Sequence, residues 1–75
     1  MCGIVAYVGN KSNAGKILFE GLHTLEYRGY DSSGIALINE KNNIKIYKKK
    51  GIVKLAEKKF LKEKISSKIG IGHTR

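Results

Sequence analysis

The sequence contains a single cysteine, no tryptophan, and only six acidic side chains against fifteen basic ones. One cysteine excludes an internal disulfide and any zinc site that needs several cysteines. The two histidines, His23 and His73, are too few and too far apart in the chain to indicate a metal site. No apolar run approaches the ~18 residues of a membrane span, and the N-terminus lacks the basic start of a signal peptide. We therefore expect a cytoplasmic protein with no membrane partner, no metal and no cofactor.

The positive charge is concentrated in the second half of the chain. Residues 1–40 hold three basic and four acidic side chains, whereas residues 41–75 hold twelve basic and two acidic ones. A basic half can indicate binding to nucleic acid. Here nearly all the cations are lysine, whereas base reading favours arginine, and no aromatic stacking platform lies among them. The pattern favours a solvated lysine-rich face and no nucleic-acid partner.

Apolar patterning in the first half predicts a strand, a helix and a loop. Residues 3–9 form a continuous apolar run bounded by glycines, which favours a strand covered on both faces. Apolar residues then recur at helical spacing over 14–27, where Gly21 indicates close approach to a neighbouring backbone. Residues 28–29 should end this helix, and 30–33 should form an ordered loop.

The second half predicts two strands joined by a hairpin, a helix and a last strand. Residues 34–38 are typical of a buried strand, 39–43 of a hairpin turn and 44–49 of a half-exposed strand that ends before Gly51. A second amphipathic helix follows, with a lysine face and an apolar stripe made of Ile52, Leu55, Ala56 and Phe60.

The final strand covers 69–73 and carries glycines at positions 70 and 72. They leave little side chain to pack, which is typical where a ligand or another backbone comes near. Seventy-five residues allow one small α+β domain with the order β-α-β-β-α-β, and burial is marginal at this length. A domain ending on such a strand would be unusual, so we expect the front part of something larger.

The single cysteine stands directly behind the initiator methionine. Aminopeptidase removal of Met1 would leave Cys2 with a free α-amine. An α-amine has a pKa of roughly 7.7–8.0 and a thiol about 8.5, so both can lose a proton near neutral pH. The amine can then take the thiol proton, as in enzymes with an N-terminal threonine nucleophile. The alternative is a small buried apolar residue, the commonest role of a lone cytosolic cysteine.

Three motifs occur in a fixed order: Cys-Gly-Ile-Val at 2–5, Leu-Glu-Tyr-Arg-Gly-Tyr-Asp-Ser-Ser-Gly at 25–34, and Gly-His-Thr-Arg at 72–75. Together they resemble the opening of a class II glutamine amidotransferase, and the resemblance covers the chain end to end. It implies a partial N-terminal-nucleophile hydrolase fold, an α/β/β/α sandwich. Tyr30 separates the chain from the amidophosphoribosyltransferases, which carry glutamine there. The resemblance is closest to members that pass the ammonia of glutamine to fructose 6-phosphate.

The resemblance also implies roles for individual residues. Cys2 matches the nucleophile that attacks the glutamine carboxamide. Arg75 matches the arginine that holds the substrate α-carboxylate, a task suited to a bidentate guanidinium; the alternative is a disordered terminal cation.

Four further residues receive supporting roles by the same resemblance. Arg28 would brace the N-terminal strand near the thiol, with an ordinary cation at a helix C-terminus as the alternative. His73 and Thr74 would shape the pocket and support the arginine that follows them, and Gly3 would support the nucleophile.

The family's Asn-Gly oxyanion donors and the aspartate for the substrate amine would lie beyond residue 75, as would the sugar isomerase domains. Residues 1–75 would then be the N-terminal part of a type 2 glutamine amidotransferase domain in a homodimeric parent enzyme, and inactive alone. The competing hypothesis is a non-enzymatic basic module that binds RNA or an acidic partner through residues 41–64.

Overall fold

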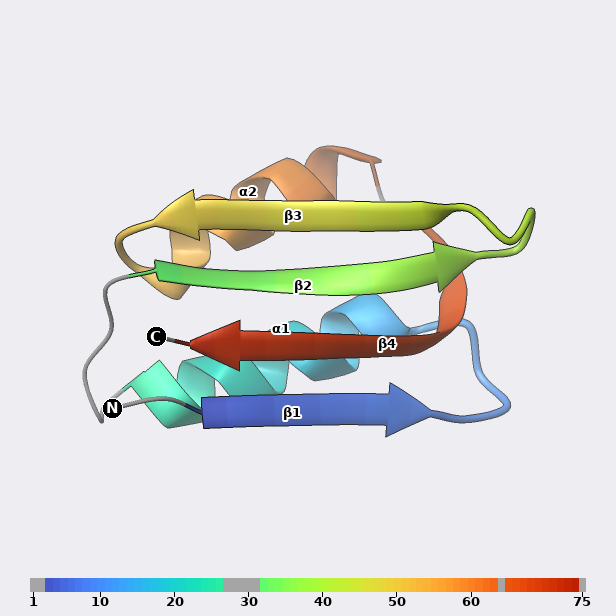
Figure 1. The fold of residues 1–75 in the computed structure, drawn as a ribbon, viewed down its shortest axis with the longest axis horizontal. Helices are drawn as coiled ribbons and strands as arrows, with labels where there is room; N and C mark the ends of the chain where they lie inside the picture. Colours follow the sequence, from blue (N-terminus) through green and yellow to red (C-terminus); the bar gives the residue numbers. More distant parts are fainter. Residues whose placement is uncertain (1–2, 27–31, 64, 75) are drawn as a thin grey trace.

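A computed structural model describes residues 3–26, 32–63 and 65–74 (Figure 1). It contains six elements, whose order confirms the predicted β-α-β-β-α-β arrangement. They are β1 (Gly3–Val8), α1 (Ala14–Leu25), β2 (Ser32–Asn39), β3 (Ile44–Lys50), α2 (Val53–Glu63) and β4 (Ser67–Thr74).

The four strands form one antiparallel sheet in the order β1-β4-β2-β3. The last strand of the sequence is therefore inserted between the first and the second. Both helices lie behind the sheet in Figure 1, with α1 over β1 and β4 and α2 over β2 and β3. The described chain thus has one helix layer and one sheet layer.

The core lies between these two layers. Its centre is an aromatic group, in which the rings of Phe19 and Phe60 lie 5.5 Å apart and Tyr47 meets Phe60 edge-on, also at 5.5 Å. Aliphatic side chains from both helices and from β2 surround it, namely Ala14, Leu18, Leu22, Ile35, Leu37, Val53 and Ala56. Most of these side chains lie in helices and strands that the sequence predicts, because their apolar residues recur with helical or strand periodicity.

Helix α2 is rotated relative to its prediction. Val53, Ala56 and Phe60 face the core, whereas Ile52 and Leu55 are 42% and 47% exposed. The stripe that starts at Val53 keeps the i, i+3, i+7 spacing and ends on the large Phe60 ring, which explains why it is preferred.

Helix α1 packs closely on the sheet through small residues. A Cβ on Gly21 would lie 2.9 Å from Cγ1 of Val5, so the predicted close approach is to a side chain rather than to a backbone. A Cβ on Gly15 would overlap the Phe60 ring. These contacts fix α1 against the first strand and against α2.

The predicted hairpin turn is confirmed between β2 and β3. The Asn39 side-chain oxygen accepts the backbone N–H groups of Lys41 and Asn43, each at 2.9 Å. Asn42 adopts φ 63°, a conformation that asparagine tolerates. Gly51, at φ 102°, ends β3 as predicted.

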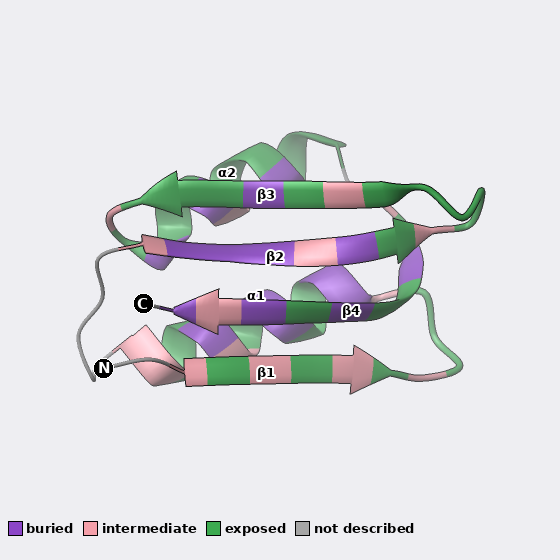
Figure 2. Ribbon diagram, viewed as in Figure 1, coloured by how far each residue is buried: buried purple, intermediate pink, exposed green. Residues whose placement is uncertain are grey.

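The sheet face turned away from the helices is uncovered within the described chain, and we call it the open face (Figure 2). The prediction that the first strand is covered on both faces is wrong here, because Ile4 and Val8 are each 78% exposed. Strand β3 is half exposed as predicted, but Tyr47 is its buried residue while Ile44 and Ile46 lie on the open face.

The bounds of three elements also differ from their predictions. Helix α1 ends at Leu25 rather than at 27, and β4 covers Ser67–Thr74 rather than 69–73. Ser32 and Ser33 begin β2 by pairing with Lys50 and Lys49, whereas the sequence predicts a loop there. The predicted helix end at 28–29 and the loop residues 30–31 lie outside the described residues.

Candidate active site

Two of the predicted site residues meet at one end of the sheet. Gly3 of β1 pairs with Thr74 of β4, and Thr74 pairs with Ser33 of β2. These three residues form a row on the helix face that we call the Gly3 row. Thr74 and Ser33 are both fully enclosed, at 1% and 0% exposure.

The space at the start of this row fits a glycine closely. A Cβ on Gly3 would lie 2.7 Å from Cδ1 of Leu25 and 3.2 Å from Oγ1 of Thr74. Real Cβ atoms do not approach carbon this closely, so a larger residue would require the end of the Leu25 side chain to move. The backbone that directly follows Cys2 is therefore held between the end of α1 and β4.

His73 lies on the opposite side of the sheet. It pairs with Ile4 and lines a hollow of about 210 Å³ on the open face, together with Ile46, Lys48 and Ile71. The structure thus brings Gly3 and Thr74 together and places His73 on the other face. Cys2, Arg28 and Arg75 lie outside the described residues.

Sequence reasoning missed the buried hydroxyl of Ser33. Its Oγ has no hydrogen-bond partner among the described residues, although the residue is fully buried. Ser33 directly precedes the apolar run at 34–38, and extending the predicted strand by one residue would have drawn attention to it, since buried polar groups are normally paired.

A second missed group joins the two helices. His23 Nε2 lies 2.7 Å from Glu57 Oε1, and His23 Nδ1 lies 3.6 Å from Glu26 Oε1. The hydrogen bond to Glu57, with the charges of both carboxylates, raises the pKa of His23 above 6.5, while partial burial opposes the shift. The His23 side chain is 41% exposed, and its bridge to α2 was not predicted.

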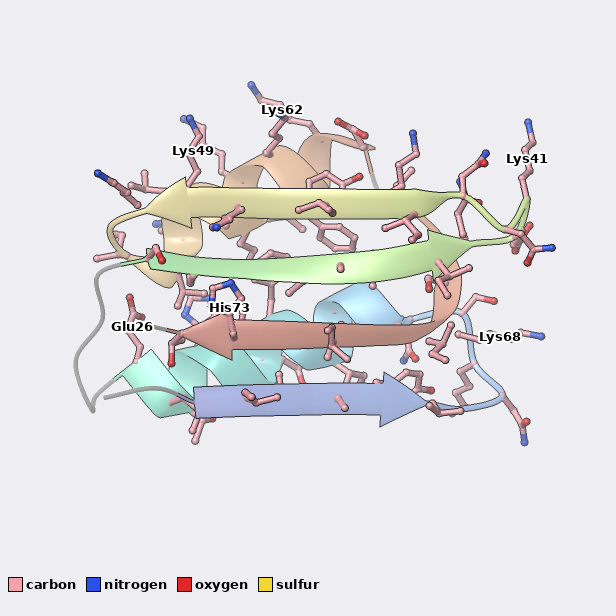
Figure 3. The ribbon with its side chains drawn as sticks, in the orientation of Figure 1. Glu26, Lys41, Lys49, Lys62, Lys68 and His73 are labelled. Carbon is pink, nitrogen blue, oxygen red and sulfur yellow. The ribbon has the colours of Figure 1, made fainter. Side chains whose placement is uncertain are left out.

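The lysine-rich half forms an exposed surface, as predicted. Lys49, Lys58, Lys59 and Lys62 line a hollow of about 550 Å³ between β3 and α2, and Lys41, Lys49, Lys62 and Lys68 point outward from the margins of the molecule in Figure 3. The two aromatic side chains of these elements, Tyr47 and Phe60, are 2% and 7% exposed. They offer no face on which a base could stack.

The part of the chain that the structure describes contains neither a cluster of metal ligands nor a membrane-spanning helix. No three histidine, cysteine or carboxylate side chains gather there as metal ligands would. Neither described helix is long and apolar enough to cross a membrane.

The fold is that of the glutamine amidotransferases. The glutamine phosphoribosylpyrophosphate amidotransferase of B. subtilis superposes with a TM-score of 0.81 at 25% identity, and its match covers 100% of this chain and 16% of that one. A structure described as the allosteric regulatory enzyme of purine biosynthesis gives 0.82, with the same identity and coverage. The predicted partial N-terminal-nucleophile hydrolase fold is confirmed.

The sequence is similar to glutamine–fructose-6-phosphate aminotransferases over its whole length. The identity is 51% to the Bacteroides thetaiotaomicron enzyme, 48% to that of Haemophilus ducreyi and 52% to that of Caldanaerobacter subterraneus subsp. tengcongensis. Each match covers 100% of this chain, which spans 12% of the length of these relatives. No family model matches the sequence. The resemblance predicted from the three motifs is thus confirmed.

Proposed function

We propose that residues 1–75 are the N-terminal part of a glutaminase domain, in an enzyme that passes ammonia from glutamine to fructose 6-phosphate and forms glucosamine 6-phosphate. The observation that carries this proposal is the match of the whole chain, at about half identity, to relatives named for that reaction. The matched segment is 12% of the length of such a relative, and the rest of the glutaminase domain and the sugar isomerase domains belong to the remaining part.

Cys2 is the nucleophile in this proposal. After removal of Met1, its α-amine takes the thiol proton, and the thiolate attacks the side-chain carbonyl carbon of glutamine. The tetrahedral intermediate collapses when the amide nitrogen accepts a proton and leaves as ammonia. Water then cleaves the γ-glutamyl thioester, which releases glutamate and restores the thiol.

The Gly3–Thr74 pair supports this assignment. Cys2 directly precedes Gly3 and Arg75 directly follows Thr74, so the antiparallel pairing joins the two segments that carry the nucleophile and the carboxylate-binding arginine. A site works best when its groups stand on rigid elements with supported neighbours.

The supporting residues take different positions in the proposal. Thr74, enclosed in the Gly3 row, supports Arg75 from the helix face. His73 shapes the pocket from the open face, where it lines the apolar hollow. Arg28 follows the end of α1 by three positions and braces the N-terminal strand. The parent enzyme is a cytoplasmic homodimer of hexosamine biosynthesis that binds no nucleic acid and needs no cofactor.

The test uses the full-length enzyme that begins with this sequence. Cys2→Ala should abolish amination driven by glutamine while leaving amination by free ammonia, because only the glutaminase step needs the thiol. Intact-mass measurement of the unmodified enzyme should show loss of Met1. Glutamine hydrolysis at the unmodified rate in Cys2→Ala would remove Cys2 from the mechanism.

A second arm assays residues 1–75 alone, with the matched Cys2→Ala chain as control. The proposal expects no thiol-dependent release of glutamate, since one oxyanion donor can contribute ~10²–10³ in rate and the family's donors are not in this segment. Turnover above the control would show that these residues form an oxyanion hole of their own.

A further inference from the structure

The N-terminus of α2 is capped by a residue from the other helix. Glu26, the residue after α1, accepts the backbone N–H of Val53 at 2.9 Å through its Oε2 atom. Helix α2 has no acidic side chain in its own first turn, and the apolar Ile52 precedes it. A carboxylate at this position satisfies a free N–H group and complements the helix dipole.

His23 connects this cap to the body of α2. It stands one turn before Glu26, and its Nδ1 lies 3.6 Å from Glu26 Oε1. Its other ring nitrogen, Nε2, lies 2.7 Å from Glu57 Oε1, one turn into α2. One imidazole therefore stands between two carboxylates, one at the end of α1 and one on α2.

We propose that His23, Glu26 and Glu57 form a proton-dependent clamp, which holds the start of α2 against the end of α1 while the imidazole is protonated and loosens when it is neutral. The clamp has the geometry that such a switch requires. An imidazolium donates a proton from both ring nitrogens, one toward each carboxylate, whereas neutral imidazole donates from only one.

The direction of the pH effect follows from the position of His23. Its pKa is raised above 6.5, mainly by the hydrogen bond to Glu57. A raised pKa in the folded state means that the clamp contributes fully below pH 6.5, the ordinary value, and that the contribution is lost as pH rises through the raised pKa. The range in which the clamp responds therefore begins near pH 6.5 and extends above it.

The other charged groups around His23 leave this pair of carboxylates dominant. The helix-facing positions of β1, of β2 and of β4 from Gly70 to Thr74 carry no charged side chain among the described residues. In β3, which packs on α2, Lys45 and Lys49 alternate with the buried Tyr47. The remaining charged residues of the two helices are Lys16, Glu20, Lys54, Lys58, Lys59, Lys62 and Glu63. Glu57 shares a surface hollow with three of these lysines, Lys54, Lys58 and Lys62.

The clamp also bears on the proposed active site. Glu26 directly precedes residues 27–31 in the sequence, the part of the middle motif that contains Arg28. Loosening of Glu26 should therefore change the glutaminase rate. This consequence rests on the proposed function, whereas the clamp itself does not.

The test is hydrogen exchange of the full-length protein, measured by mass spectrometry between about pH 5.5 and 8.5 and expressed as protection relative to the intrinsic exchange rate. Protection of residues 52–57 should fall about five-fold as pH rises through the pKa of His23, the size expected for a partly exposed charge pair. His23→Gln, which cannot titrate, should remove this dependence. Glu20→Gln is the matched control, since it removes a charge from the same helix and should keep the dependence.

A pH profile that is the same in the unmodified protein and in His23→Gln would overturn the clamp. Should His23→Gln unfold, the pKa of His23 is measured by NMR in Glu57→Gln, where it has to fall toward the ordinary value; an unchanged pKa overturns the proposal as well. The Cys2→Ala protein should show the unmodified exchange profile. Failure of the clamp is therefore distinguishable from failure of the proposed chemistry.

Discussion

The two faces of the sheet are made by the same four strands, yet only one of them is covered by the described chain. The helix face carries a small set of close contacts, in which glycines such as Gly70 and Gly72 admit α1 and the neighbouring strand. The open face carries β-branched side chains that remain 39–78% exposed, namely Ile4, Val8, Ile38, Ile44, Ile46, Ile69 and Ile71.

The difference shows that apolar content alone does not reveal how a face is covered. Both faces are apolar, which is why the first strand looks buried on both sides in the sequence. Close approach distinguishes the helix face at Gly3, Gly70 and Gly72, where an added Cβ would meet side chains of α1 or of the neighbouring strands. An apolar face as wide as the open one calls for a covering layer. The four-layer sandwich predicted from the sequence would supply that layer.

The largest contrast between the faces should appear on truncating one large apolar side chain in each. Phe19 is 0% exposed on the helix side, and Ile46 is 66% exposed on the open face. Phe19→Ala should lower the free energy of unfolding by about 3–5 kcal/mol, because it leaves a cavity beneath Phe60. Ile46→Ala should lower the free energy of unfolding of residues 1–75 by less than about 1 kcal/mol, because the Ile46 side chain buries little apolar surface.

Urea unfolding followed by circular dichroism measures both changes. A loss of about 3–5 kcal/mol approaches the whole stability of a small domain, so we expect the Phe19→Ala spectrum to show unfolded protein even without urea. Equal losses for the two variants would contradict the contrast, and would indicate that a partner covers the open face in solution.

A smaller loss is expected when a glycine of the helix face gains one carbon. A Cβ on Gly70 would lie 2.6 Å from Leu37 Cδ2 and 2.7 Å from the carbonyl oxygen of Ala36. The backbone oxygen cannot move aside cheaply, so Gly70→Ala should destabilise by about 1–3 kcal/mol. Ile71→Val, one residue along the same strand but on the open face, is the control and should change the unfolding midpoint little.

The same contrast explains how far the sequence predicts the fold. Periodicity identified all six elements, because 3.6-residue and two-residue repeats are local properties of the chain. It did not decide which set of alternating side chains meets the helices, so Tyr47 rather than Ile46 proved to be buried. In α2, periodicity selected Ile52 and Leu55 instead of Val53. Rotating the helix by the angle of one residue gives an apolar stripe of similar length, so the sequence pattern alone does not distinguish the two.

The candidate site likewise has a part that the sequence predicts and a part that only packing creates. The motifs at the two ends of the chain predicted that Gly3 and Thr74 belong to one site, and the strand register pairs them. The contact between His23 and Glu57 joins residues 34 positions apart and involves no motif, so no local pattern could have predicted it. Packing of α1 on α2 creates it.

An alkaline titration sharpens the comparison within β3. Tyr47, on the helix face, donates a hydrogen bond from its hydroxyl to Oε1 of Glu63 at 3.0 Å. Burial together with this bond raises the pKa of Tyr47 to about 12. Because the folded pKa exceeds the ordinary value of 10.0, the stabilising contribution is complete below pH 10.0 and is lost as pH rises toward about 12. Tyr47→Phe should lower stability by about 1 kcal/mol at neutral pH through the lost hydrogen bond, and should flatten the alkaline slope. Unfolding midpoints measured from pH 8 to 11 test both effects, and a slope that persists in Tyr47→Phe would assign it to another group.

Two buried serines, at opposite ends of β2 and β4, should respond to alanine substitution with opposite signs. The hydroxyl of Ser67 is directed at the carbonyl oxygens of Ile38 and Ile69, at 2.6 Å and 2.7 Å, where the ladder between the two strands shifts register. Ser67→Ala should cost about 1–2 kcal/mol, because these carbonyls lose their donor inside the protein.

Ser33, in the Gly3 row, has no such partner among the described residues, and removing an unpaired buried hydroxyl should be neutral or stabilising by up to about 1 kcal/mol. Urea midpoints of the two alanine variants, measured side by side, give the comparison. A loss for Ser33→Ala equal to that for Ser67→Ala would mean that the Ser33 hydroxyl does bind a group at the end of the sheet that Gly3 and Thr74 form, and Ser33 would then be added to the proposed active site.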